Sequence, residues 1–313
     1  MPRSLKRLAG GDFVRHGMMV FGAAAAMNGC NYVFHVINSR HLGVVGYGEL
    51  ASLVATLTLL SFPAAAISLG VAKLAAEFHA VGDHAAIRRL FDLVVRWGIA
   101  VGVALLIVAI PTLPWSTHFL RIDDKLAVLL TVGAIAVNLV LPALRAVLQG
   151  VEDFGAYARS IVIEGAAKLV LGVGLPFAGY GVDGALFGFL GGALIAGAYV
   201  AFCVRPHLEG TEPRMVVDAR RLLETASGVG ATSLAFAVLG FADVVAVKHF
   251  LDANQAGLYG ALSLIGKIFL FAVGFVPQVV LPKVARRVAA GRGSGQYLRY
   301  SVATVGVVGA IGI

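Results

Sequence analysis

The chain has 313 residues, of which 59% are hydrophobic and only 13% are charged, and its mean hydropathy is +0.88. Because soluble globular proteins carry about 25% charged residues, this composition excludes a soluble globular, disordered or fibrous protein and indicates a polytopic membrane protein. The net charge of +8 does not by itself indicate nucleic-acid binding, because in a membrane protein the positions of the basic residues carry the information.

Apolar segments long enough to cross a bilayer follow one another along the chain. A spanning helix needs about 20 mostly apolar residues. We predict nine, at residues 17–38, 47–70, 93–114, 126–148, 160–179, 184–204, 225–247, 257–281 and 299–313. The expected fold class is therefore all-α, a bundle of transmembrane helices. Cys30 and Cys203 lie inside these segments, where we interpret them as small core residues and not as a disulfide or a metal pair.

The basic residues predict the orientation of the spans. With the N-terminus in the cytoplasm, 19 Lys and Arg residues fall on the cytoplasmic side, 4 fall outside and 2 lie within spans. This distribution follows the positive-inside rule. We therefore expect a multi-pass protein of the plasma membrane with a cytoplasmic N-terminus.

The two ends of the chain share a pattern of spans and charges. Tyr47-Gly48 aligns with Tyr259-Gly260 at an offset of 212 residues, which also places Asp243 opposite Asn31. Six spans separate the copies, so both insert with the same orientation, as in parallel transporter repeats. We predict a first six-helix lobe at 1–218 and the start of a second lobe at 219–313. The second copy then has only three spans, and we expect more beyond Ile313.

Polar side chains inside the first and fifth spans are candidate site residues. Asn28, Asn31 and His35 lie on one face of the first span, and they either form interhelical hydrogen bonds or line a cavity. Glu164 and Lys168 stand four residues apart, so they can neutralise each other on one helical face. That pair is either a structural ion pair or part of a cavity. Ionisable groups within spans are costly and are functional candidates by default.

Later spans add further candidates. Asp243 in the seventh span is either a coupling-ion or proton site, or a partner for Lys248 or Lys267. Lys267 lies too deep in the eighth span to reach the membrane surface easily, so we expect it to meet water, an acid or an anionic substrate. Arg145 can extend to the surface from the inner end of its span and is a weaker candidate. Three glycines at intervals of four, Gly184, Gly188 and Gly192, predict close helix packing.

Short motifs resemble those of a known transporter group. Arg40-His41-Leu42-Gly43 followed by Tyr47-Gly48 is similar to the R-x-L-G-x-x-x-Y-G start of the second helix in polysaccharide transporters. These are the oligosaccharide-flippase branch of the MOP (multidrug/oligosaccharidyl-lipid/polysaccharide) exporter superfamily. Residues 248–259 resemble the start of their eighth helix, and Leu148-Gln149-Gly150 and Pro282 also fit. The resemblance runs over essentially the whole chain.

This resemblance implies two lobes around a central cavity and alternating access. The expected function is movement of a lipid-linked oligosaccharide or polysaccharide precursor across the membrane, without enzymatic chemistry or a cofactor. Lys168 and Lys267 would hold the pyrophosphate of the substrate, and the polar residues of spans one, five, seven and eight would line the cavity. The expected partners are the lipid-linked substrate and membrane lipids, with glycan-assembly enzymes as candidates and no nucleic acid.

Three alternatives stay open. A cation-coupled multidrug exporter of the same superfamily would favour a carboxylate in the first span, where this chain has Asn28 and Asn31. An integral-membrane glycosyltransferase could use Asp123-Asp124 with a metal, although we interpret these residues as solvated loop acids. A non-transporting assembly subunit would be favoured if the nine-span chain were complete.

Overall fold

The computed structural model describes residues 3–62, 64–208, 219–263 and 266–267. The chain forms two compact units, Met1–Gly257 and Leu258–Ile313. The described residues are helices joined by short turns, and no strand occurs among them, so the all-α prediction is confirmed. The long helices of the first unit are α1 (Arg3–His41), α2 (Gly43–Ser61), α3 (Ala64–Ala80), α4 (His84–Leu120), α5 (Lys125–Gly150), α6 (Phe154–Leu175), α7 (Gly181–Val204) and α8 (Ala219–Phe250).

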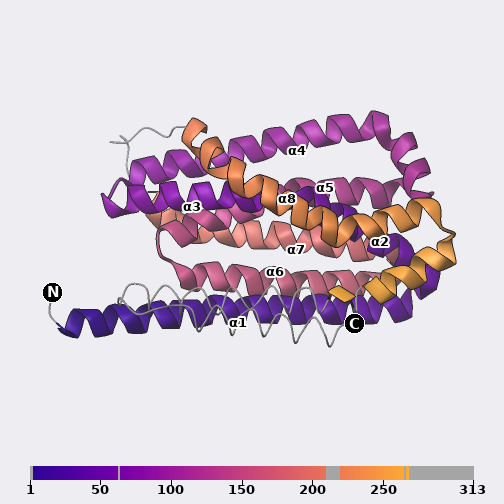
Figure 1. Ribbon diagram of the computed structural model, residues 1–313, viewed down its shortest axis with the longest axis horizontal. Helices are drawn as coiled ribbons and strands as arrows, with labels where there is room; N and C mark the ends of the chain where they lie inside the picture. Colours follow the sequence, from indigo (N-terminus) through magenta and orange to yellow (C-terminus); the bar gives the residue numbers. More distant parts are fainter. Residues whose placement is uncertain (1–2, 63, 209–218, 264–265, 268–313) are drawn as a thin grey trace. The chain divides into compact units, whose positions relative to one another are not determined.

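Within the first unit, helices distant in sequence lie side by side. α1 packs on α6, α6 on α7, α7 on α5 and α5 on α4, while α8 packs against α2 and α3 (Figure 1). α6 and α7 form an antiparallel hairpin around the short segment Pro176–Tyr180. The chain turns there because Gly179 and Gly181 have φ angles of 98° and 50°, a region that glycine enters without a steric penalty.

Aspartates fix the starts of three helices. Asp83 accepts a hydrogen bond from the Ala86 N–H at 3.0 Å, and Asp153 accepts one from Ala156 at 2.9 Å. Asp124 accepts from the N–H groups of two residues in the first turn of α5. Each carboxylate satisfies amide donors that have no partner inside the helix and lies at the positive end of the helix dipole. Short turns between the helices follow from these caps.

The predicted glycine ridge is confirmed as the contact surface of α7 on α6. A Cβ atom added at Gly184 would lie 2.7 Å from the Cβ of Leu175, and one at Gly192 would lie 2.9 Å from the Lys168 backbone nitrogen. At Gly188 the added atom would collide with the backbone of Gly172. The two backbones therefore approach as closely as small residues allow, which is the usual way that transmembrane helices gain packing contacts.

Five segments of the described chain are long and apolar enough to cross a membrane. They are Arg15–His41, Gly43–Ser61, His84–Leu120, Lys125–Gly150 and Phe154–His207, the last of which contains both α6 and α7. The span predicted at 47–70 is instead divided between α2 and α3. The sequence has a proline at position 63, and proline removes a helical hydrogen bond and clashes with the preceding turn.

The predicted span at 225–247 falls within α8, whereas most of 257–281 and all of 299–313 lie outside the described residues. The lobe boundary at 218/219 and the 212-residue repeat stay predictions.

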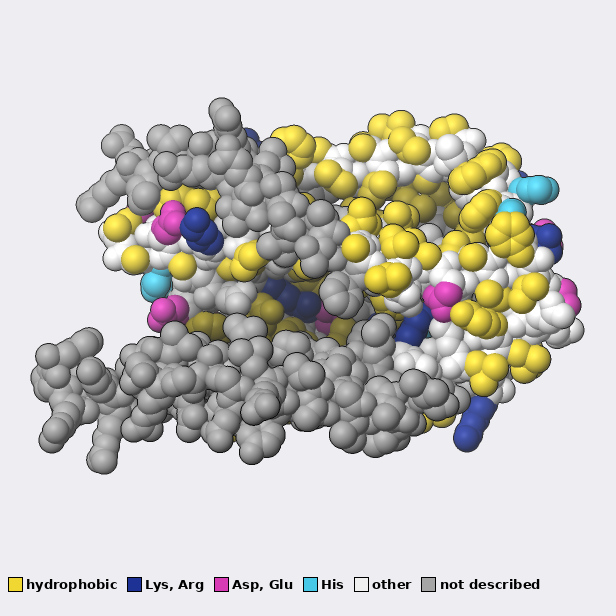
Figure 2. All heavy atoms as spheres, viewed as in Figure 1, with side chains coloured by type: hydrophobic (Ala, Val, Ile, Leu, Met, Phe, Trp, Pro, Cys, Tyr) yellow, Lys and Arg dark blue, Asp and Glu magenta, His cyan; other side chains and the backbone are white. Residues whose placement is uncertain are grey.

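The surface of the first unit suits a hydrocarbon environment. On the face shown in Figure 2, hydrophobic side chains are spread widely over the described surface, and charged side chains lie at its ends and also in its middle part. α4 carries large exposed apolar side chains, including Trp97, Ile107 and Trp115, which are 62%, 65% and 68% exposed. Because water would penalise so large an apolar area, these helices form a multi-pass membrane protein.

Candidate functional site

A buried ion pair joins α5 to α6. The Arg145 Nη2 atom lies 2.6 Å from the Glu164 Oε2 atom, and the two side chains are only 11% and 10% exposed. Arg145 also donates to Ser160, from Nε to the hydroxyl oxygen at 3.0 Å and from Nη2 to the carbonyl oxygen at 2.9 Å. The guanidinium is therefore held by three hydrogen bonds, as a charge in a low-dielectric interior requires.

This geometry corrects two expectations. Glu164 pairs with Arg145 on a neighbouring helix, not with Lys168 on its own helix. Arg145, which the sequence ranked as a weaker candidate able to extend to the membrane surface, turns inward and becomes a central member of the site. The Arg145 side chain places its guanidinium opposite the Glu164 carboxylate and not in the water at the membrane surface. Sequence spacing compares positions on one helix and carries no signal for such a cross-helix pair.

Lys168 joins α6 to α1 and α7. Its side-chain ammonium donates a hydrogen bond to the Asn31 side-chain oxygen and lies 4.7 Å from the centre of the Phe189 ring. The residue is only 3% exposed. Interhelical hydrogen bonding is one of the two roles expected for Asn31, and the structure shows it. The aromatic face contributes a further favourable interaction with the cation.

Together these residues form a cluster, which we call the polar cluster, of Asn31, Arg145, Ser160, Glu164 and Lys168. It contains two basic side chains and one carboxylate, and all five residues lie in the first unit. Glu164 bonds directly to Arg145, and Lys168 bonds to the neutral Asn31 side chain, so the five residues carry one more positive than negative charge. Such an arrangement attracts an additional anion more strongly than it attracts a cation.

The other candidates of the first span differ in position. Asn28 is exposed on α1, whereas His35 is half-buried. The Tyr47 hydroxyl lies 3.3 Å from the His35 Nδ1 atom, which ties α1 to the start of α2. His35 thus has a structural contact between α1 and α2.

The candidates of later spans are Asp243 on α8 and Lys267 in the second unit. Asp243 is half-buried in α8, which packs against α2, α3 and α4. Lys267 is half-buried in the second compact unit. A shared cavity that includes Lys267 stays a prediction.

Neither metal chemistry nor an outer carboxylate pair has support in the residues that the structure describes. Among them there is no group of three or more His, Cys, Asp or Glu side chains that could hold a metal ion. Cys30 and Cys203 are both free thiols. Asp124 caps the start of α5, so one member of the Asp123-Asp124 pair has a structural role.

Comparison with known proteins agrees with this architecture. A family model described as "Polysaccharide biosynthesis protein" matches residues 14–287. The chain belongs to this family. The match includes α2 to α8 and the larger part of α1, and therefore the whole polar cluster. No curated protein sequence matches the chain significantly.

Solved structures show that the fold is that of the MOP superfamily. A multidrug resistance MATE family transporter in an inward-facing conformation is 15% identical, with a TM-score of 0.61, over 87% of this chain and 64% of its own. A MOP superfamily transporter from Pyrococcus furiosus is 14% identical, with a TM-score of 0.59, over 87% and 70%. A MATE protein in complex with Br-NRF gives 14% identity and 0.58, over 88% and 73%. The chain thus spans about two thirds of the length of these proteins.

Proposed function

We propose that the protein transports a lipid-linked oligosaccharide or polysaccharide precursor across the plasma membrane by alternating access. Membership of the polysaccharide biosynthesis family is the observation that carries this proposal. The likeness to solved structures of MOP superfamily transporters supports a transport role. The excess of Lys and Arg residues on one side of the predicted spans supports a cytoplasmic N-terminus.

The charges of the polar cluster support an anionic substrate. Arg145 and Lys168 outnumber Glu164, and a pyrophosphate group would complete the balance. Lys168 is almost fully buried in this conformation. Substrate contact therefore requires α1 to separate from α6, which would exchange the amide oxygen of Asn31 for a phosphate oxygen. A phosphate oxygen carries negative charge, whereas the amide oxygen of Asn31 carries none, so the added Coulomb attraction to the ammonium would favour the separated state.

Polar residues on the remaining helices would complete the cavity. Asn28 and His35 on α1 would meet hydroxyl groups of the sugar, because both can donate and accept hydrogen bonds. Asp243 and Lys267 would contribute from α8 and the following span. The sugar would pass through the hydrated cavity while the lipid tail remains in the bilayer, so that neither part is transferred into an unfavourable solvent.

A cation-coupled multidrug exporter is the second candidate, because two of the similar structures are MATE proteins and one is a multidrug resistance transporter. An exporter of cationic drugs needs negative charge in its cavity, whereas the polar cluster has excess positive charge. The Pyrococcus furiosus structure is described as having a binding pocket of reversed polarity that suggests a different function. The same fold can therefore carry cavities of different charge.

Reconstituted vesicles can distinguish these candidates. A fluorescent oligosaccharide linked to a lipid pyrophosphate is compared with a cationic dye under an imposed ion gradient. We expect transport of the first, measured as the fraction of sugar accessible to a membrane-impermeant glycosidase, and no transport of the dye.

Asn28 offers a charge test at an exposed position. Asn28→Asp adds a negative charge to α1 and should slow transport of the pyrophosphate substrate, while Asn28→Gln should remain near wild type. Dye transport without oligosaccharide transport would overturn the proposal.

A further inference from the structure

The C-terminal end of α6 leaves one backbone carbonyl without its usual helical partner. In an α-helix the N–H group of each residue bonds to the carbonyl oxygen four residues earlier. Pro176 directly follows α6 and has no N–H group, so it cannot donate to the buried Gly172 carbonyl oxygen. Because a buried carbonyl without a donor is costly, another group has to supply this hydrogen bond.

Asn38 on α1 supplies the hydrogen bond. Its Nδ2 atom donates to the Gly172 oxygen at 3.0 Å and to the Phe34 oxygen, one turn earlier on α1, at 2.9 Å. The residue is buried. Its Oδ1 atom is also buried and has no hydrogen-bond partner among the described residues. The side chain is therefore held at this position by its two N–H donors.

Three helices meet at this hydrogen bond. A Cβ atom added at Gly172 would lie 2.6 Å from the Phe34 ring on α1 and 3.1 Å from the Ala185 oxygen on α7. A Cβ atom added at Gly188 on α7 would collide with the Gly172 backbone. Phe34 is fully buried. Movement of α1 away from α6 at this level would therefore disrupt the packing of all three helices.

The bond between Asn38 and Gly172 determines which side chain of α1 faces Lys168. Gly172 follows Lys168 by four residues on α6, and Asn38 follows Asn31 by seven on α1, so each pair lies on one helical face. With Asn38 bonded to Gly172, Asn31 lies opposite Lys168 and accepts its hydrogen bond. A shift of α1 by one residue would turn its polar face by about 100°, and Asn31 would no longer face Lys168.

The two bonds between α1 and α6 respond differently to an anion. At Lys168 the Asn31 side chain accepts a hydrogen bond, so an ionised phosphate oxygen can take its place. At Gly172 the Asn38 side chain donates. An ionised phosphate oxygen has no proton to donate and would face the carbonyl oxygen with charge of the same sign. An anionic substrate therefore competes with Asn31 and leaves Asn38 in place.

The contacts of α1 also differ on the two sides of the polar cluster. Toward the C-terminal end of α1, the His41 Nε2 atom lies 3.2 Å from the Pro176 oxygen, and the His41 ring stacks on Phe177 at 4.1 Å. Toward its N-terminal end, Met27 packs on Gly165 of α6, and methionine is a flexible side chain that adapts to altered packing. The N-terminal part of α1 is therefore the part that can separate from α6.

We propose that Asn38 is a positioning residue of the polar cluster, which keeps α1 attached to α6 at Gly172 throughout the transport cycle. The separation that exposes Lys168 is then confined to the N-terminal part of α1, which lies on the cytoplasmic side in the predicted topology. The substrate reaches the site from the cytoplasm without opening a path along α6 to the outer surface. This proposal rests on the transport function proposed above and specifies how access to the same site is controlled.

A pair of substitutions separates positioning from packing. Asn38→Leu leaves the Gly172 carbonyl without a donor, and Pro176→Ala restores an N–H group within α6 that can bond to it. In the double variant the carbonyl has a partner, but α1 is no longer attached to it. The controls are Pro176→Ala alone, which keeps Asn38, and Asn138→Leu. The Asn138 side chain donates to the Ala134 oxygen of its own helix at 2.8 Å.

Three quantities are measured for each variant. These are Tm in detergent, transport of the fluorescent lipid-pyrophosphate oligosaccharide in vesicles, and labelling of Cys30 by a membrane-impermeant maleimide added from either side. Cys30 is a free thiol, and its Cβ atom would lie 3.5 Å from a Cβ added at Gly165. Its labelling therefore reports the separation of α1 from α6, without any substrate, and Cys203 is replaced by Ser throughout.

We expect labelling of the wild-type protein from the cytoplasmic side. Asn38→Leu should lower Tm, reduce the maximal transport rate about tenfold or more, and raise labelling from the outer side by a similar factor, because a buried carbonyl loses its donor. The double variant should regain the Tm of Pro176→Ala but neither the transport rate nor the one-sided labelling. Asn138→Leu should keep both.

Recovery of transport together with Tm in the double variant would show that Asn38 only satisfies a carbonyl, and would overturn the proposal. Normal transport and one-sided labelling in Asn38→Leu would do the same. If Asn38→Leu does not fold, the comparison of the double variant with Pro176→Ala gives the same decision. One-sided labelling that depends on Asn38, in a wild-type protein that does not transport the oligosaccharide, would refute the proposed function alone.

Discussion

Replacing Glu164 by Gln tests whether the polar cluster depends on its single carboxylate. The variant keeps the size of the side chain and an oxygen that can accept from Arg145, but it removes the negative charge. Two cations, Arg145 and Lys168, then remain without the carboxylate that balances them. Arg145→Met instead leaves one cation and one anion, because Glu164 and Lys168 share a helical face four residues apart.

The structure sets the expected magnitudes. Removing one partner of a buried ion pair destabilises a protein by about 3–5 kcal/mol, and this is the expected loss for Glu164→Gln. Arg145→Met removes the other partner of the same pair, together with three hydrogen bonds, so the same range of about 3–5 kcal/mol applies to it. We therefore expect the two single variants to lose similar amounts of stability.

Thermal unfolding in detergent micelles, followed by tryptophan fluorescence, measures both variants. At about 2 °C per kcal/mol, Glu164→Gln and Arg145→Met should each lower Tm by roughly 6–10 °C. Controls are Asp92→Asn and Arg159→Met, which change exposed residues of α4 and α6 and should shift Tm by less than about 1 °C.

The double variant Arg145→Met/Glu164→Gln completes a thermodynamic cycle. If the pair acts as one unit, the double variant should be more stable than the sum of the single losses predicts. A Tm for Glu164→Gln within 1 °C of wild type, or strictly additive losses, would show that the ion pair does not hold α5 to α6 and would refute the reasoning.

Three further predictions concern packing, charge and topology. Gly188→Ala should lower Tm by a few degrees because its Cβ would meet the α6 backbone, whereas Gly174→Ala, with no atom within 4 Å, should not; equal Tm values would contradict the tight α6–α7 contact. In oligosaccharide export assays Lys267→Glu should abolish transport at normal membrane abundance and Lys267→Arg should retain part of it; normal export by Lys267→Glu would exclude a cationic cavity. Cysteines at Ser4 and Thr211 should resist labelling from outside intact cells, and efficient labelling of either would reverse the topology.

The sequence alone was sufficient to predict a helical membrane protein. It also predicted a packing face that is defined by residue spacing within a single helix. Low charge and long apolar segments require helices in a bilayer, because backbone groups in hydrocarbon must bond within their own segment. The four-residue spacing of Gly184, Gly188 and Gly192 predicted a packing face, and the structure shows α6 against it. Asn31 was identified as polar within a span, with hydrogen bonding between helices as one of its two expected roles.

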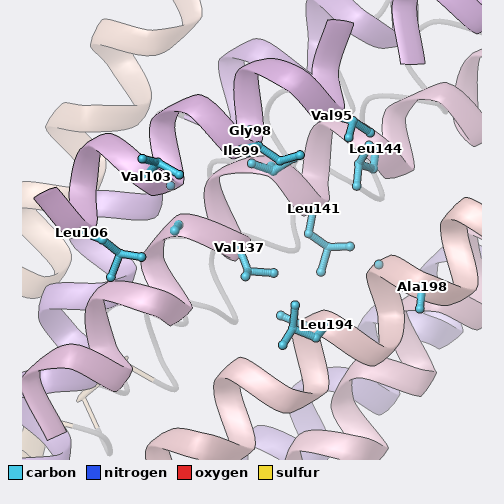
Figure 3. A pocket seen from close by; sticks show the side chains of 15 residues that line it. Val95, Gly98, Ile99, Val103, Leu106, Val137, Leu141, Leu144, Leu194 and Ala198 are labelled. Carbon is cyan, nitrogen blue, oxygen red and sulfur yellow. The ribbon is translucent and has the colours of Figure 1, made fainter. Parts of the chain in front are cut away.

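Tertiary structure decided which helices are neighbours and, with that, which charges meet. The spacing of Glu164 and Lys168 suggested a pair on one helix, yet Arg145 approaches from α5 and Lys168 turns to Asn31 on α1. An apolar pocket lined by Val103, Leu141 and Leu194 (Figure 3) depends in the same way on α4, α5 and α7 lying together, although α6 intervenes in sequence. Periodicity describes the faces of a single helix, whereas ion pairs and grooves between helices arise from the order in which those helices pack.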